Sequence, residues 1–113
     1  MHPRLLEYLV SKDVCIYNSA KLSKELRYAA DHHDLSYGIC TIVRHAVFYA
    51  HKRSGEYYDA LAFSLCDYAN ARFGEYGFTH ISMDAWSNMS NVEQNAARKY
   101  ALLKLITDIE YES

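Results

Sequence analysis

The chain of 113 residues contains few of the residues that force a backbone to turn, with only 4 glycines and 1 proline. It therefore has no composition typical of a flexible linker, no low-complexity segment and no internal repeat. The glycines are scattered, and no lysine follows a spaced pair of them as in a phosphate-binding loop. These absences exclude kinase-like and dinucleotide-binding proteins. At this length we expect a single domain, residues 1–113.

Neither sign of charge dominates, because 12 basic and 14 acidic residues leave a net charge of −2. Such a balance gives no overall attraction to nucleic acid or to an anionic membrane. The most apolar long run, residues 36–53, is too short and too often charged to span a bilayer. Three widely spaced cysteines and the lack of a secretory signal predict free thiols in a reducing compartment. We therefore expect a cytoplasmic protein without a membrane segment.

Tyrosine is the compositional outlier, with 11 residues in the chain. A tyrosine ring is large, rigid and apolar with a polar tip, so it suits an interaction surface. The commoner arrangement of such rings is half burial at the edge of a core. We expect most of them to pad the core, and keep a tyrosine-rich interaction surface as the alternative.

The spacing of apolar residues predicts a mainly α protein, a compact single-domain bundle of about five helices. Helices are expected at residues 3–12, 19–33, 36–53, 55–73 and 91–110. The expected caps of three of them are Asn18 or Ser19, Ser36, and Ser90, and the last forms a capping box with Glu93. Residues 14–17 and 78–83 leave open one short two-stranded β element, although we predict the second segment as a loop. In the last helix we expect Asp108 to face solvent.

No arrangement of residues predicts catalysis. Cys40 and Cys66 lie at the margins of apolar stripes, which favours structural cysteines over a nucleophile. No two histidines lie one helical turn apart on one face, and the cluster of residues 31–34 would need a distant ligand such as His80 to hold a metal. The carboxylates of the fourth helix have the period of an exposed face. We expect no enzymatic activity, no metal and no cofactor.

A helix-turn-helix over residues 26–45 is an alternative with a defined chemistry. It would place on the DNA-facing side Ser36, Tyr37, Thr41, Arg44 and His45. Arginine can bridge two acceptors of guanine, and hydroxyls can bind phosphate. Three features disfavour it: Asp34 stands where the turn usually has glycine, the second helix is long, and acidic residues would approach phosphate.

The leading hypothesis is a non-catalytic module that binds another protein as an inhibitor or adaptor. Three successive helices each carry one aromatic residue on the polar face, namely Tyr28, Phe48 and Phe63. Aromatic residues in polar surroundings are typical of binding hot spots, so these three would form a patch if their helices pack side by side. The acidic rim of Glu56, Asp59 and Asp67 favours a partner with a basic surface.

The general character of the chain is that of a phage or mobile-element accessory protein that blocks a host protein or complex. A third hypothesis is a structural homo-oligomer, in which the same aromatic residues are buried against a symmetry mate. The two main hypotheses differ in which residues of the 36–53 helix they use. DNA binding would depend on Thr41 and Arg44, whereas protein binding would depend on Phe48.

Overall fold

A computed structural model describes residues 1–71 and 83–112. They form six α-helices and one short 3₁₀ turn: α1 (Pro3–Ser11), α2 (Ser19–His32), η1 (Leu35–Tyr37), α3 (Ile39–His51), α4 (Glu56–Ala71), α5 (Met83–Asn88) and α6 (Asn91–Glu110). The all-helical fold class is thus confirmed, with five main helices and the short α5. Residues 14–17 form a link without strand structure, and residues 78–82 lie outside the described part of the chain.

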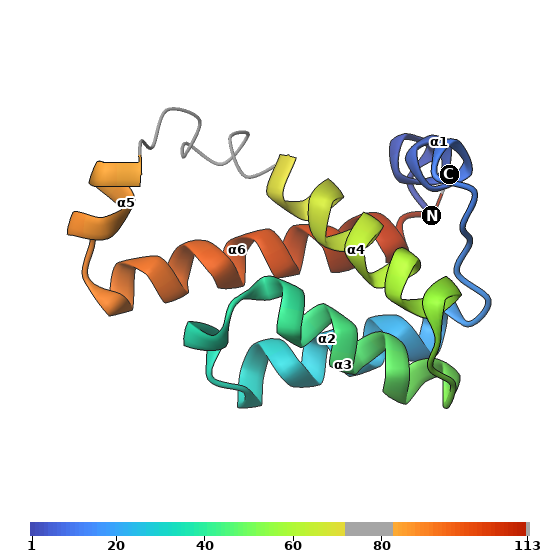
Figure 1. The fold of residues 1–113 in the computed structure, drawn as a ribbon, viewed down its shortest axis with the longest axis horizontal. Coiled ribbons are helices and arrows are strands. Elements are labelled where there is room, and N and C mark those ends of the chain that lie inside the picture. Colours follow the sequence, from blue (N-terminus) through green and yellow to red (C-terminus); the bar gives the residue numbers. More distant parts are fainter. Residues whose placement is uncertain (72–82, 113) are drawn as a thin grey trace.

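Helix α6 runs along the long axis of the globule and packs against α2 and α4 (Figure 1). α4 crosses one side of α6, while α2 packs against another. α3 lies beside α2 and also packs against α4, so that α3 is flanked by two helices. α1 lies against α4 near the end of α6, where the two chain termini meet, and α5 lies at the opposite end (Figure 1). The molecule measures 38 × 26 × 26 Å.

The core consists of the apolar stripes that the helical period predicts. Fully buried leucine, isoleucine and valine side chains come from all five main helices, among them Leu5, Leu22, Val43, Leu61 and Leu105. One residue of α6 departs from the prediction. Asp108, expected at the surface, is only 2% exposed. Its carboxylate accepts a hydrogen bond of 2.7 Å from the Tyr68 hydroxyl, which offsets part of the cost of burying it.

Local start signals place two helices as predicted. The Asn18 side chain accepts a hydrogen bond of 3.2 Å from the Lys21 backbone N–H at the start of α2. Ser90 accepts one of 3.1 Å from the Glu93 N–H at the start of α6. Each cap satisfies a backbone donor that the first helical turn leaves without a partner. These contacts explain why both helices begin where they do.

The central helix begins three residues later than predicted. Ser36 lies inside η1, and its backbone N–H donates to the Asp34 carboxylate at 2.9 Å, so Ser36 does not cap α3. Gly38 precedes α3 with φ +92°, a conformation that strongly favours glycine. At the other end the left-handed residue is Lys52, with φ +54°, in place of the expected glycine. Gly55, with φ +125°, instead leads into α4.

A disulfide joins Cys40 of α3 to Cys66 of α4, with their Cα atoms 5.4 Å apart. The prediction of three free thiols is therefore wrong for this pair, while Cys15 is free and exposed. The physical reason lies in the packing: each cysteine lies at the margin of an apolar stripe, and the margins of adjacent helices face each other. Among the described helices, none is long and apolar enough to cross a membrane.

Most tyrosines lie at the surface, so the expectation that they pad the core is wrong. Of the ten described tyrosines only Tyr68 is buried, and three are half-buried. The exposed ones are Tyr17, Tyr28, Tyr37, Tyr49, Tyr100 and Tyr111. The core is filled instead by aliphatic side chains and alanine. Most of the described tyrosine rings are therefore available at the surface for contacts with another molecule.

Candidate functional site

The three aromatic residues singled out in the sequence lie on three helices in contact with one another. Tyr28 on α2 is 57% exposed, Phe48 on α3 is 46% exposed, and Phe63 on α4 is 66% exposed. α2 and α4 both pack against α3, so Phe48 lies on the middle helix of the three. The side-by-side packing that a shared patch requires is present.

A groove of about 450 Å³ runs between α2 and α3. Tyr28 and Tyr49 contribute rings to its lining, and Ile42, Ala29 and Ala46 form an apolar floor. The rings of Tyr49 and Phe48 meet edge to face, with centroids 5.5 Å apart. Tyr49 therefore connects Phe48 to the groove. Tyr49 was not among the residues predicted from the sequence, although it follows Phe48 directly and also lies outside the apolar stripe of its helix.

A second, smaller groove of about 210 Å³ lies between α3 and α4. Phe63 lines it together with Arg44 and the Cys40–Cys66 disulfide. Arg44 and Phe48 are four residues apart on α3 and so share a face of that helix. The adjacent helices α2, α3 and α4 thus carry four exposed aromatic side chains: Tyr28, Tyr49, Phe48 and Phe63. We call these four residues the aromatic surface.

The predicted acidic rim is distributed differently from the sequence expectation. Glu56, Asp59 and Asp67 are all exposed on α4. Asp59, however, lies 3.9 Å from the Arg44 guanidinium, and both side chains are 65% exposed. The pKa of Tyr8 on α1 is raised mainly by burial and, to a smaller extent, by the negative charge of Asp67. Asp59 therefore faces α3, where it already has a basic neighbour, whereas Asp67 faces α1.

The residues of the helix-turn-helix alternative do not share one helix. Thr41, Arg44 and His45 are exposed on α3, whereas Ser36 and Tyr37 lie in η1 before Gly38. α2 and α3 lie alongside each other and run in opposite directions (Figure 1), whereas the two helices of the DNA-binding motif cross steeply. The Ser36 hydroxyl is also 3.3 Å from Asn91 Oδ1 on α6. Of the five residues, Thr41, Arg44 and His45 therefore still share an exposed face of α3.

The cluster of residues 31–34 has structural roles at the end of α2. Asp31 lies 3.8 Å from the Lys99 ammonium, and His32 stacks on Tyr28 with ring centroids 4.3 Å apart. Asp34 accepts the hydrogen bonds of Ser36, which lower its pKa. In the described ranges, no three His, Cys, Asp or Glu side chains gather to hold a metal ion. His80 lies outside them.

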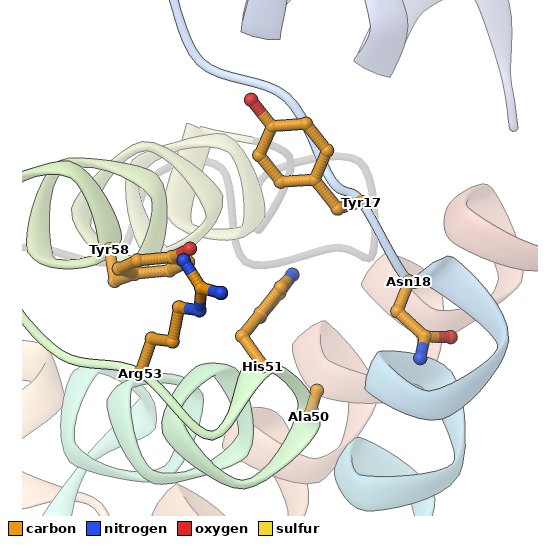
Figure 2. A pocket seen from close by; sticks show the side chains of 6 residues that line it. All are labelled: Tyr17, Asn18, Ala50, His51, Arg53 and Tyr58. Atoms are coloured by element: carbon orange, nitrogen blue, oxygen red, sulfur yellow. The ribbon is translucent and has the colours of Figure 1, made fainter.

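A pocket of about 470 Å³, which no sequence pattern indicates, lies at the C-terminal end of α3. Figure 2 shows its six lining residues: Tyr17, Asn18, Ala50, His51, Arg53 and Tyr58. They come from the link before α2, the start of α2, the end of α3 and the start of α4. Their distance in the sequence, and the lack of any motif, explain why no pattern connected them.

His51 is the most unusual residue of this pocket. Its Nδ1 lies 2.9 Å from the Val47 carbonyl oxygen. Because a carbonyl can only accept, Nδ1 carries the proton, and Nε2 is left with a lone pair in the neutral ring. That Nε2 atom is buried and has no hydrogen-bond partner in the described part of the chain. In Figure 2 the tip of the ring points into the space between Tyr17, Asn18 and Tyr58.

Comparison with known proteins adds no family to this description. No protein-family model, curated protein or solved structure matches the chain.

Proposed function

We propose that the chain is a non-catalytic protein-binding module, an inhibitor or adaptor that docks through its aromatic surface. The observation that carries the proposal is the exposure of four aromatic side chains on adjacent helices. Two of them, Tyr28 and Tyr49, line an apolar groove, and Phe63 lines a second one. Aromatic anchors beside grooves are the features from which binding hot spots are built.

The partner that we propose has a basic surface. Glu25 lies in the groove between α2 and α3, and Glu56 and Asp59 lie on α4 at the other side of α3. A partner bearing lysine or arginine near an apolar centre would satisfy both the carboxylates and the rings. Charged groups at the rim mainly raise the association rate and the salt dependence of binding, while the rings supply the affinity.

The biological setting that we propose is that of a phage or mobile-element accessory protein that blocks a host protein or complex in the cytoplasm. The cytoplasmic assignment was based on free thiols, and the Cys40–Cys66 disulfide removes that argument. The disulfide would persist most easily in an oxidising compartment. Alkylation of the protein in intact cells, followed by mass spectrometry, tests the assignment: reduced Cys40 and Cys66 support the cytoplasm, and a full disulfide argues against it.

Affinity capture tests the docking proposal. Wild type, Phe48→Ala/Phe63→Ala and the control Val10→Ala/Val92→Ala would be used as baits in the presence of nuclease. Val10 and Val92 are 68% and 80% exposed and lie on α1 and α6, away from the aromatic surface. We expect a basic protein that wild type and control recover and the Phe48→Ala/Phe63→Ala bait loses. Equal recovery of every protein by the three baits would contradict the proposal.

DNA binding is the second candidate, and it retains the exposed Thr41, Arg44 and His45 on one face of α3. A gel shift at low salt on random and genomic fragments tests it. Retardation that is lost in Arg44→Gln would support DNA binding, and no retardation would end it. For the third candidate, a homo-oligomer, light scattering that gives the mass of a monomer at high concentration would be the contradicting result.

A further inference from the structure

We propose that the pocket at the end of α3 binds a nucleoside monophosphate, or a closely similar ring-bearing phosphomonoester, as a ligand. The pocket is separate from the aromatic surface, since none of its six lining residues belongs to that surface. This inference therefore does not depend on the docking proposal. It follows from three properties of the described lining residues: an arginine without an ionic partner among them, a histidine nitrogen that lacks a hydrogen-bond donor, and aromatic side chains in the wall.

The first property is the charge of the pocket. Among the described residues that line it, Arg53 alone carries a permanent charge and none is acidic. The Arg53 guanidinium has no ion pair or hydrogen bond with any other described residue. An arginine fork binds two oxygens of a phosphate or carboxylate at once. The pocket therefore favours an anionic group next to Arg53.

The second property is the need for a hydrogen-bond donor. His51 Nε2 is buried without a hydrogen-bond partner among the described residues, and a buried polar atom in that state destabilises the fold unless a donor reaches it. Nδ1 is committed to the Val47 carbonyl, so Nε2 can only accept while the ring is neutral. No other lining side chain satisfies it. A ligand hydroxyl or amine would, and a sugar hydroxyl or a base amine provides one within the same molecule as the phosphate.

The third property is the aromatic walls. The Tyr58 ring lies 5.4 Å from the His51 ring between centroids, and Tyr57 connects it to Tyr17 through centroid distances of 5.3 and 6.0 Å. Flat aromatic faces stack planar bases.

The size and the remaining polar group agree with this ligand class. A volume of about 470 Å³ is far larger than a single phosphate needs and lies in the range of small-molecule sites. Asn18 uses its Oδ1 atom to cap α2, which leaves its amide N–H groups as donors at the pocket wall. Figure 2 shows Asn18 on the side of His51 opposite Arg53. A ligand that spans the pocket can thus contact both.

Calorimetry with the purified chain tests the proposal, using the four common nucleoside monophosphates, the matching nucleosides and inorganic phosphate as probes. We expect at least one monophosphate to bind with a dissociation constant below about 1 mM. Its nucleoside and phosphate alone should bind at least about tenfold more weakly, since each lacks one of the two recognised groups.

Two arginine variants distinguish this site from general attraction of anions. Arg53→Gln should weaken binding by about tenfold or more, whereas Arg44→Gln, a control at an arginine outside the pocket, should bind as wild type. Backbone NMR signals of residues 17, 18, 51, 53 and 58 should shift on titration. The proposal is overturned if no monophosphate binds, if phosphate alone binds equally well, or if Arg53→Gln binds as tightly as wild type.

Discussion

The Tyr68 hydroxyl donates a 2.7 Å hydrogen bond to Asp108 Oδ2, and both side chains are buried between α4 and α6. The backbone N–H of His2 donates at 2.7 Å to the Asp108 carbonyl oxygen in addition. Asp108 therefore takes part in contacts that join α4, α6 and the segment that leads into α1. Burying a carboxylate destabilises the fold unless hydrogen bonds compensate for the lost water. The contacts of Asp108 are therefore favourable only while α4, α6 and the segment before α1 stay packed together.

Removal of the Tyr68 hydroxyl should therefore destabilise the fold. Tyr68→Phe keeps the ring and removes one donor to a buried carboxylate, so the free energy of unfolding should fall by about 1.5–3 kcal/mol. Urea unfolding followed by circular dichroism measures it. Tyr37→Phe, at a ring that is 77% exposed, is the control and should change stability by less than about 0.5 kcal/mol. Equal stability of the two variants would contradict the role of the Tyr68 hydroxyl.

The disulfide predicts a defined thiol count and a loss of stability on reduction. Without reductant, alkylation of the folded protein should modify only Cys15, and a non-reduced peptide map should link Cys40 to Cys66. Reduction should lower the free energy of unfolding by about 3 kcal/mol, since the bond closes a loop between residues 26 apart. Cys15→Ser is the control and should show the same loss on reduction. Three alkylated thiols in the purified, air-exposed protein would refute the pairing.

Two neighbouring substitutions test where α3 begins. Apart from its two chain neighbours, no described residue would come within 4 Å of a Cβ atom at Gly38, so Gly38→Ala acts only through the φ of +92°. That conformation is strained for alanine and should cost about 1–3 kcal/mol. Ser36→Ala should cost clearly less, because Ser36 does not cap the helix. If Ser36→Ala proved more destabilising than Gly38→Ala in chemical denaturation, Ser36 would be the residue that caps α3.

Acid should weaken the contact between α2 and α6. Hydrogen bonds from Arg27 and Ser23 lower the pKa of Glu110 to about 2. A folded-state pKa below the ordinary value of 4.5 stabilises the fold above that value, and this contribution is lost as the pH falls from 4.5 towards 2. Because the Glu110 side chain is 37% exposed, solvent screening reduces the contribution to about 1 kcal/mol.

The variant Glu110→Gln measures this contribution. At pH 7 it should lower the melting temperature relative to wild type, and the difference should shrink steadily below pH 4.5, the ordinary carboxyl value. Glu7→Gln, on the exposed side of α1, provides the comparison for a glutamate outside the Arg27 contact. A difference between Glu110→Gln and wild type that stays constant down to the lowest pH would show that charge at Glu110 is not its cause.

The helices were predictable because each buries one stripe, and the period of that stripe can be recognised in a single sequence. The caps at Asn18 and Ser90 were predictable for the same reason, since a cap acts within one turn. The start of α3 was not, because Ser36 and Gly38 both favour a boundary and only the packed structure decides between them. The Cys40–Cys66 pairing and the buried Asp108 depend on which helices are neighbours, which a period does not reveal.

The two proposed sites also differ in how far the sequence alone predicts them. Tyr28, Phe48 and Phe63 could be singled out because each interrupts the polar face of its own helix. The pocket at the end of α3 could not, since Tyr17, His51 and Arg53 are ordinary residues until the fold brings the link before α2, the end of α3 and the start of α4 together. His51 in particular has the sequence position of a helix end, and its unsatisfied Nε2 is visible only once the Val47 carbonyl is seen to hold Nδ1.

The most direct test of the docking proposal is the dissociation constant of the captured basic partner, measured by calorimetry with purified proteins. Wild type, Phe48→Ala/Phe63→Ala and the control Val10→Ala/Val92→Ala would be compared at the same salt concentration. We predict that the aromatic variant binds at least about tenfold more weakly than wild type and that the control binds as wild type does. Equal dissociation constants for all three proteins would contradict the role of the aromatic surface.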